Sequence, residues 1–471
     1  MKLGPLIGGA EGAVVTGFAI DHRKVAPGTI FGAFEGARVN GEDFIEAAVQ
    51  AGAIAVVARP EAKVTGAVHI ADANPRQRFA SLASQFFAPF PAVTAAVTGT
   101  NGKTSTVEMT RQLWRMAGFH AASIGTLGVT TADERVSTGL TTPDVVTFLS
   151  NVAGLAREGV THVAFEASSH GLSQYRTEGL PVRAAAFTNL SRDHLDYHGD
   201  MATYFTAKMR LFAEVLAEDG TAVVWADDPH APRVEDLARM RGNRLITVGE
   251  HGKTLRLASR TPSLLGQTLE IEAEDKLHIV RLPLIGAYQA ANALTAAGLV
   301  IATGGDVGAT LANCARLQPV HGRLERAVIA ANGAPVYVDY AHTPDALEAA
   351  IAALKPHTDG RLILVLGAGG DRDPGKRQLM GQVAASGADV AIVTDDNPRT
   401  EDPAEIRRAI LTGAPDAMEI GDRRAAIAAA IAMAEPHDIV LVAGKGHEQG
   451  QIVGEMVLPF DDVAVARECA A

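Results

Sequence analysis

Residues 92–105 read AVTAAVTGTNGKTS, a short uncharged run followed by a glycine-rich turn. Ala92–Val97 is rich in small and β-branched residues, which favours a strand buried on both faces of a parallel sheet. Gly99 and Gly102 let the turn fold tightly, so that successive backbone N–H groups can point into one hollow. A buried strand that ends in such a turn is typical of α/β proteins that bind phosphate groups.

A cation and a hydroxyl follow the turn. Lys103 and Thr104 stand at the start of a helix predicted over Thr104–Ala117, whose N-terminus carries partial positive charge. They predict a phosphate-binding loop in which Thr104 is a ligand of Mg²⁺. The match to the general pattern G-x-x-x-x-G-K-[ST] is incomplete, because Val97 stands where the pattern has its first glycine. The Gly-Lys-Thr sequence alone therefore leaves nucleotide binding undecided.

The length and charge of the chain limit its function classes. Its 471 residues predict about three domains at ~150 residues each. A formal net charge of −12 and a pI near 5.7 argue against a protein that grips nucleic acid or an anionic membrane through a basic surface. Anionic ligands must then be held by local donors.

Cysteine usage and hydropathy indicate a cytoplasmic protein without membrane insertion. Cys314 and Cys469 are the only cysteines, too few for a disulfide framework or a thiolate metal cluster. The N-terminus is not typical of a signal peptide, because Gly4 and Pro5 break its apolar run. Leu282–Gly305 carries no charged residue, but its proline and polar residues favour a buried helix over a membrane span.

The full string TGTNGKTS at 98–105 resembles the ATP loop of the Mur ligase family and of its relative folylpolyglutamate synthase, which share the departure at Val97. The resemblance extends over nearly the whole chain. It implies an α/β protein of three domains: a small uridine-diphosphate-binding domain over 1–90, a central P-loop-type parallel-sheet ATPase domain over 91–317, and a Rossmann-like amino-acid-binding domain over 318–471. The loop residues implied to contact ATP are Gly99, Thr100, Asn101, Gly102, Lys103, Thr104 and Ser105.

The first domain is predicted to contain strands over Val14–Ile20, Thr29–Phe34 and Ala53–Ala58 and a helix over Phe44–Ala51. The segment 20–57 resembles the uridine-diphosphate-binding domain of the family. The positions that match its nucleotide contacts are Ile20, His22, Ala37, Arg38 and Val39.

His22 departs from the family, which usually has Ser at this position. Either the imidazole replaces the hydroxyl as a partner of the nucleotide, or the contact is lost. Without the resemblance, a simple surface ion pair between Asp21 and Arg23 is the alternative interpretation of this segment.

The central domain repeats a buried strand followed by a polar loop. Val160–Glu166 and Ala184–Leu190 are predicted strands, and such loops gather along one edge of a doubly wound sheet, where ligands bind. Glu166 and His194 are therefore placed to bind a Mg²⁺ held through Thr104. Taken singly, a Glu is more often a solvated charge and a His a satisfied core group.

In the Mur ligases the residues that match Glu166 and His194 bind Mg²⁺. The residue that matches Lys208 carries a carbamate formed with CO₂ and ligates a second Mg²⁺, whereas composition alone predicts a surface lysine. Residues matching Thr141, Thr142, Ser168, Gln174 and Arg176 hold the nucleotide-linked peptide. The family's Asn before the paired threonines is Leu140 here.

Three further residues are assigned by the resemblance to the ATP site. Leu282–Ala297 matches a short motif in which Asn292 approaches the adenine. His321–Glu325, HGRLE, matches the hinge into the last domain, with Arg323 at the ATP phosphates, and Asp339 matches a residue near the ribose.

The last domain alternates strands with alanine-rich helices such as Arg423–Ala434, which predicts a parallel sheet of Rossmann type. Its predicted strands are Val336–Val338, Leu362–Leu366, Val390–Thr394 and Ile439–Val442. The segment GAGGD at 367–371 lacks the glycine spacing of a dinucleotide site, so NAD binding is not expected.

Asp396, Asn397, Pro398 and Arg399 form a DNPR motif, which resembles the version found in ligases that accept meso-diaminopimelate rather than lysine. A guanidinium can bind the second carboxylate of diaminopimelate in bidentate fashion, and an Asp and a backbone carbonyl can take its ammonium. Residues matching Arg377, Gly444 and Glu448 complete the family's site. An isolated DNPR would more simply be an Asn-Pro turn with a solvated Arg399.

The resemblance implies an ATP-dependent ligase that joins meso-diaminopimelate to the D-glutamate γ-carboxylate of UDP-N-acetylmuramoyl-L-alanyl-D-glutamate through an acyl phosphate, in cytoplasmic peptidoglycan precursor synthesis. It implies that Mg²⁺ is the cofactor, that ATP is a substrate and that the active form is a monomer. The residues expected to be catalytic are Lys103, Lys208, Glu166, His194 and Arg323. Two alternatives are a folylpolyglutamate synthase, against which the first domain and DNPR argue, and a nucleotide-binding module whose ATP turnover drives a partner.

Overall fold

The computed structural model describes residues 1–8, 12–36, 39–137, 139–263 and 265–471. Its contacts divide the chain into two compact units. The first unit comprises Met1–Arg256 and Leu294–Thr310, and the second comprises Leu257–Ala293 and Leu311–Ala471. Helix α10 (Ala287–Ala302) begins in the second unit and ends in the first.

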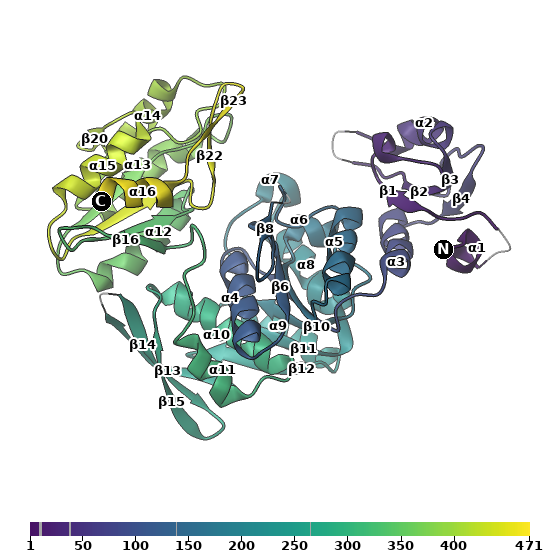
Figure 1. Ribbon diagram of the computed structural model, residues 1–471, viewed down its shortest axis with the longest axis horizontal. Coiled ribbons are helices and arrows are strands. Elements are labelled where there is room, and N and C mark those ends of the chain that lie inside the picture. The colour runs from purple at the N-terminus through teal and green to yellow at the C-terminus, as the bar shows by residue number, and fades with distance from the viewer. Residues whose placement is uncertain (9–11, 37–38, 138, 264) are drawn as a thin grey trace. The chain divides into compact units, whose positions relative to one another are not determined.

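The N-terminal part of the first unit is a four-stranded parallel sheet, drawn in purple in Figure 1. Its strands, in order, are β1 (Gly17–Ala19), β2 (Thr29–Gly32), β3 (Ala53–Ala58) and β4 (Val68–Ala71), and its helices are α1 (Leu3–Ile7), α2 (Ile45–Gln50) and α3 (Pro75–Phe87). Phe79 of α3 is fully buried and packs edge-on against Phe18 of β1 at 5.3 Å between ring centroids. The predicted strands Val14–Ile20 and Thr29–Phe34 are present as β1 and β2, but both are shorter than predicted.

The central part of the first unit contains the strand order β12-β11-β10-β5-β9-β6-β7-β8, which is part of a larger sheet. The strands on either side of β5 (Val93–Thr98) run parallel to it, as predicted. The other strands are β6 (Ala121–Gly125), β7 (Gly128–Thr130), β8 (Arg135–Val136), β9 (His162–Glu166), β10 (Val182–Phe187), β11 (Leu216–Trp225) and β12 (Arg244–Gly249). The helices are α4 (Lys103–Met116), α5 (Val145–Arg157), α6 (Ser169–Ser173), α7 (Leu195–His198), α8 (Met201–Arg210) and α9 (Ala231–Met240).

Pro143 is not the first residue of helix α5, which begins at Val145. The Asp144 side chain caps it instead, because one carboxylate oxygen accepts the N–H groups of Val146 and Thr147 at 3.0 and 3.2 Å. The cap satisfies N–H groups at the helix start that have no partner within the helix.

The second unit contains a six-stranded sheet with the strand order β16-β17-β21-β18-β19-β20. Alternate residues of β18 belong to different cores: Leu362, Leu364 and Leu366 to one, Ile363 and Val365 to the other. The sheet is therefore covered on both faces, as a Rossmann-type domain requires.

The elements of this sheet agree closely with the strand and helix predictions. Its strands are β16 (Glu325–Ile329), β17 (Pro335–Asp339), β18 (Leu362–Leu366), β19 (Val390–Val393), β20 (Met418–Glu419) and β21 (Ile439–Ala443). Its helices are α12 (Pro344–Leu354), α13 (Gly375–Gly387), α14 (Pro403–Leu411), α15 (Arg423–Met433) and α16 (Asp462–Ala470). The remaining elements of the unit are β13 (Leu255–Ser263), which begins in the first unit, with β14 (Gly266–Ala273), β15 (Lys276–Leu282), α11 (Val307–Cys314) and the hairpin β22 (Gly450–Val453) and β23 (Met456–Pro459).

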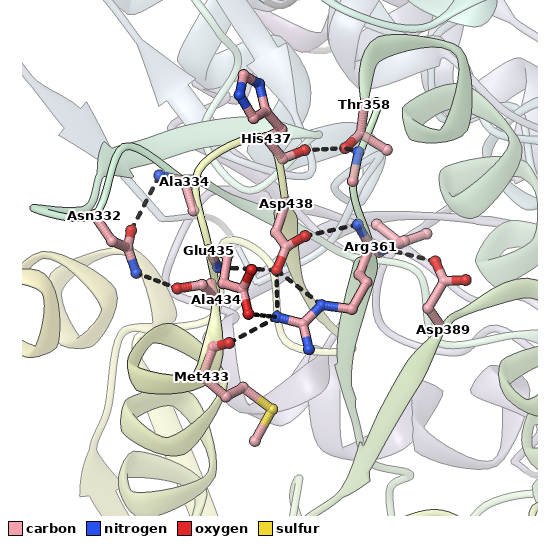
Figure 2. A network of polar contacts seen from close by, with 12 residues as sticks. Asn332, Ala334, Thr358, Arg361, Asp389, Met433, Ala434, Glu435, His437 and Asp438 are labelled. Atoms are coloured by element: carbon pink, nitrogen blue, oxygen red, sulfur yellow. Dashed lines mark hydrogen bonds and ion pairs between the residues drawn. The ribbon is translucent and has the colours of Figure 1, made fainter.

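The edge at which β18 and β21 begin is fastened by Arg361 and Asp438 (Figure 2). Arg361 donates to the Asp438 carboxylate from its backbone N–H at 2.7 Å, from Nε at 3.0 Å and from a terminal nitrogen at 2.7 Å. The backbone N–H of Glu435 donates to the same carboxylate at 2.9 Å. Because the strands are parallel, the opposite edge is left to the loops that carry the predicted ligand contacts.

No helix within the described part of the chain combines the length and the apolar character needed to cross a membrane.

Candidate active site

The phosphate-binding loop lies between β5 and α4 and is shaped by the end of β10. Gly99 has φ +150°, and a Cβ at this position would lie 1.9 Å from the Thr188 hydroxyl, so that only glycine fits. The Thr100 N–H donates to Asn189 O at 2.9 Å, and the Asn101 N–H donates to the Asn189 side chain, also at 2.9 Å. The loop conformation is thus fixed by Thr188 and Asn189, which no sequence motif singled out.

Two lysines meet at this loop. Lys103 donates from Nζ to Gly99 O at 2.9 Å and to Thr100 O at 2.8 Å. Lys208 donates from Nζ to the same Gly99 O at 2.7 Å, is 1% exposed, and lies 4.3 Å from the centroid of the Tyr204 ring. Burial, reinforced by the charge of Lys103, holds the pKa of Lys208 well below its usual range. Lys208 is therefore buried, unlike the surface lysine that composition alone predicts.

Glu166 ends β9 and is 2% exposed. Its carboxylate accepts the Thr126 N–H at 2.7 Å and the Thr126 hydroxyl at 3.3 Å. The Thr126 hydroxyl lies 3.4 Å from that of Thr104 and 3.1 Å from that of Thr141. The structure therefore joins Glu166, Thr104 and Thr141, three predicted site residues, through a fourth that was not predicted.

His194 precedes α7 in the left-handed conformation and keeps nearly half of its side chain exposed. Its ring lies 6.2 Å from the Tyr204 ring, and the Tyr204 hydroxyl lies 3.2 Å from that of Thr100. His194 thus approaches the phosphate-binding loop by way of Tyr204, on a different path from Glu166.

The oxygen ligands near Thr104 fit Mg²⁺, which combines one or two carboxylates with hydroxyl, water and phosphate oxygens. Thr104 supplies a hydroxyl at the start of α4, and Glu166 supplies a buried carboxylate one hydroxyl away. Among the residues described, no three His, Cys, Asp or Glu side chains are grouped as ligands of one metal ion.

A second cluster joins four of the five predicted peptide contacts. The Thr142 hydroxyl donates to Glu166 O at 2.8 Å and accepts the Ser168 N–H at 3.1 Å. Arg176 donates to Thr142 O at 2.8 Å and to the Gln174 side chain at 2.7 Å. Burial lowers the pKa of Arg176, although its guanidinium stays charged, which suits an anion in a partly dry site.

The uridine-type segment is described only in part, because Ala37 and Arg38 lie outside the described residues. His22 stacks on Phe44 at 4.4 Å between ring centroids. Arg23 pairs with Asp21 at 2.8 Å, and its hydrogen bonds lower the pKa of Asp21 to about 2. Ile20 is 37% exposed and Val39 57%, so both retain surface for a ligand.

In the second unit, the remaining ATP residues lie together. The Leu324 N–H donates to Asp339 at 2.6 Å, and the Arg323 guanidinium stacks over Tyr340 at 4.5 Å from its centroid. Gln289 donates to Arg323 O at 2.9 Å and accepts a bond from Asn292 at 3.1 Å. Burial raises the pKa of Asp339 to about 6, against the opposing charge of Arg323.

The DNPR motif follows β19 and faces the loop that follows β21. Asp396 and Asn397 are buried, and a Cβ at Gly444 would lie 2.5 Å from an oxygen of Asp396. Arg399 has φ +52° and donates to Gly370 O at 2.7 Å. This left-handed backbone is uncommon for Arg, and it is held by hydrogen bonds rather than by the solvated turn that an isolated motif would form.

Arg377 lies on α13 beside the same glycine-rich loop. Its guanidinium pairs with Glu401 at 2.8 Å, and its Nε is buried without a hydrogen-bond partner among the residues that the structure describes. Buried polar groups are normally paired, so this N–H is an exception beside the glycine-rich loop.

Two participants were missed by sequence reasoning although a signal existed for each. Thr126 directly follows strand β6, and Lys445 lies two residues after β21 in the sequence AGKGHE. The rule that ligands bind at strand ends applies to both. The loop after β6 contains no carboxylate, histidine or recognised motif near Thr126, and in the loop after β21 only Gly444 and Glu448 were assigned, on the resemblance.

Three family models match the chain. They are described as Mur ligase family, catalytic domain (residues 14–86), Mur ligase middle domain (97–300) and Mur ligase, glutamate ligase domain (322–446). Each matched segment lies inside one of the three predicted domains, whose boundaries stay a prediction.

Individual proteins are similar over the same length. The chain is 61% identical over 458 residues to the UDP-N-acetylmuramoyl-L-alanyl-D-glutamate--2,6-diaminopimelate ligase of Zymomonas mobilis subsp. mobilis, covering 96% of this chain and 94% of that one. It is 50% identical over 473 residues to the Bradyrhizobium diazoefficiens protein of that name, covering 98% and 97%. A solved structure of such a ligase has 34% identity and a TM-score of 0.76, covering 100% of this chain and 98% of that one.

Proposed function

This chain belongs to the Mur ligase family, and we propose that it joins meso-diaminopimelate to the D-glutamate γ-carboxylate of UDP-N-acetylmuramoyl-L-alanyl-D-glutamate at the expense of ATP. The observation that carries the proposal is the sheet edge in the second unit, where Arg399, Asp396 and Glu448 lie on neighbouring loops. A guanidinium and two carboxylates match the carboxylate and ammonium at the far end of diaminopimelate.

The reaction has two steps. An oxygen of the γ-carboxylate attacks the γ-phosphorus of ATP, the bond from phosphorus to the ADP oxygen breaks, and an acyl phosphate forms. The diaminopimelate amine then attacks the acyl carbon, phosphate leaves with its electron pair, and the amine loses a proton. Lys103 and Arg323 would stabilise negative charge on the transferred phosphoryl group, since phosphoryl transfer depends mainly on positioning and electrostatics.

Thr104, Glu166 and His194 would hold Mg²⁺, whose charge neutralises the phosphate oxygens when it is bound. The hydroxyl and carboxylate geometry around Thr126 supports this role for Thr104 and Glu166. Gly99 to Ser105 would surround the phosphates with backbone N–H groups, while Asn292 would contact the adenine and Asp339 the ribose.

We propose that Lys208 is carbamylated. Its amine nitrogen would form a bond to the carbon of CO₂, one carbon–oxygen π bond would open to a carboxylate, and the nitrogen would release a proton. The reaction needs a neutral amine, and burial favours that form of Lys208. It would also replace two neighbouring cations at Gly99 O by a cation and an anion.

The nucleotide-linked peptide would be held by Thr141, Thr142, Ser168, Gln174 and Arg176, and the uridine by Ile20, His22, Ala37, Arg38 and Val39. The amino acid would contact Arg377, the DNPR motif, Gly444 and Glu448. We propose that the protein acts as a monomer and is located in the cytoplasm, where ATP is available.

A phosphate-release assay tests the proposal. The chain is incubated with ATP, Mg²⁺ and the muramyl dipeptide nucleotide, and meso-diaminopimelate, L-lysine and L-glutamate are compared. Phosphate should be released only with both the nucleotide and diaminopimelate. Release with glutamate would favour folylpolyglutamate-type chemistry, and release without any amino acid would favour an ATPase module; either result contradicts the proposal.

A further inference from the structure

Lys445 is a fully buried cation behind the proposed amino-acid site, with 0% of its surface exposed. Its Nζ donates to Asn397 Oδ1 at 3.0 Å, to Glu448 Oε2 at 3.2 Å and to Gly450 O at 2.6 Å. An ammonium has three N–H donors, so all of them are used and none remains for a ligand. Any effect of Lys445 on the ligand must act through the residues that it holds.

The first of these residues is Asn397, whose amide can point only one way. Its Oδ1 accepts Lys445 and the Ile452 N–H at 2.9 Å, and its Nδ2 donates to Glu448 Oε2 at 2.7 Å. Exchanging the amide oxygen and nitrogen would set donor against donor at two of these contacts. Lys445 therefore fixes the Asn397 amide, which in turn holds Glu448.

The second is Glu448, whose side chain is 30% exposed in contrast to that of Lys445. Lys445 and Asn397 both donate to its Oε2. The other oxygen, Oε1, is thereby the one presented to a ligand ammonium. Removing the donors would free the carboxylate to rotate and would leave it without a nearby compensating cation.

The third is the hairpin β22–β23, the yellow hairpin in Figure 1, whose first residue is Gly450. The Arg399 N–H donates to Ile452 O at 3.0 Å, and the Gly454 N–H donates to Arg399 O at 2.7 Å. Lys445 thus binds the first residue of the hairpin through Gly450 O, and the hairpin in turn holds the backbone of Arg399. Both groups that would contact the far end of the amino acid depend on this lysine.

We propose that Lys445 is a positioning residue that makes the site selective for an amino acid carrying both an ammonium and a carboxylate at its far end. This inference rests on the proposed function. Lys445 holds the acceptor for the ammonium, Glu448, and the donor for the carboxylate, Arg399, in one geometry. Its positive charge also disfavours a ligand that brings an ammonium alone, as lysine does.

Lys445→Met tests the inference, because it keeps the length of the side chain and removes the charge and donors. The KM for diaminopimelate should rise about tenfold or more, while the KM values for ATP and the nucleotide substrate change by less than about twofold. The preference for diaminopimelate over lysine should fall by a similar factor. Lys355→Met, at an exposed lysine of the same unit, is the matched control and should leave all values unchanged.

A double-mutant cycle separates positioning from general damage. In a Glu448→Gln background, Lys445→Met should raise the KM for diaminopimelate by a clearly smaller factor than in the wild type, since the part of its effect that acts through Glu448 is already lost and only the part that acts through Arg399 remains. If Lys445→Met does not purify as a folded protein, Lys445→Gln, which removes the charge and one of the three N–H donors, takes its place, and the KM for diaminopimelate should rise in the same direction by a smaller factor.

Three outcomes overturn the inference: an unchanged KM for diaminopimelate, an equal rise in the KM of all three substrates, or independent effects in the cycle. The wild-type chain separates this failure from that of the proposed function. A wild type that does not use diaminopimelate overturns the proposed function and the inference with it. A wild type that uses it, beside an unaffected Lys445→Met, overturns the inference alone.

Discussion

Lys103 and Lys208 donate hydrogen bonds to the same oxygen, that of Gly99, at 2.9 and 2.7 Å. They come from α4 and α8, which are far apart in sequence, and Lys208 is buried. Two ammonium groups on one carbonyl repel each other, and burial penalises the charge of the inner one further. The site therefore favours an uncharged Lys208, the form from which the proposed carbamate would arise.

The first prediction concerns this lysine. Wild-type protein equilibrated with carbon-13-labelled bicarbonate should show a carbamate resonance by NMR, and Lys208→Arg should not. Phosphate release by the variant should fall by about a hundredfold or more, because a charge that positions the reacting groups is lost. An active Lys208→Arg enzyme would contradict a role for the carbamate. Lys253→Arg, at an exposed lysine that follows β12, is the control.

Glu166→Gln should lower kcat of phosphate release by about a hundredfold, because the variant keeps the shape of the side chain but removes the charge that Mg²⁺ needs. The apparent affinity for Mg²⁺, measured by titrating the metal in the assay, should fall with it. Glu158→Gln, at an exposed residue after α5, should behave as wild type. Unchanged metal dependence in Glu166→Gln would remove Glu166 from the metal site.

Arg399→Ala should lower kcat/KM for diaminopimelate by roughly 10- to 100-fold, with little change for lysine, because only diaminopimelate has the second carboxylate. The ratio of the two kcat/KM values is the measurement. Arg408→Ala, at an exposed arginine of α14, is the control. A preference retained in Arg399→Ala would refute the assignment of selectivity to this side chain.

Asp339 should make stability depend on pH. Its pKa is raised from 3.8 to about 6, chiefly by burial, so the folded state binds a proton that the unfolded state has lost in this range. The resulting stabilisation is complete below pH 3.8 and is lost as the pH rises through about 6. Urea denaturation of wild type and Asp339→Asn should show a difference that grows in favour of the variant across this window. A constant difference would contradict the assignment.

Asp438→Asn should lower the free energy of unfolding by about 2–3 kcal/mol, since it weakens the bonds that Arg361 and the Glu435 N–H make to one buried carboxylate (Figure 2). Burial alone would raise the pKa of Asp438, but these bonds outweigh it and lower the value. The contact lies at the sheet edge opposite the ligand loops, so kcat should be unchanged. Glu348→Gln, at an exposed residue of α12, is the control for the denaturation measurement.

The sequence by itself determined the fold class, the positions of most strands and the nature of the chemistry. The AVTAAV run became β5, and the strands predicted in the last domain lie within one or two residues of β17, β18, β19 and β21. Local patterns suffice here because buried parallel strands need continuous apolar runs and phosphate loops need glycine. The resemblance in TGTNGKTS and DNPR added the family and the substrate class.

Tertiary structure alone decided which side chains meet. Thr126 joins Glu166 to Thr104, Lys208 reaches Gly99, and Lys445 holds Asn397 and Glu448 together. No sequence spacing encodes these contacts, because each depends on the order in which strands are placed in a sheet and on the burial that their neighbours impose. The same burial sets the charge state of a lysine, and a composition-based interpretation had therefore placed Lys208 wrongly at the surface.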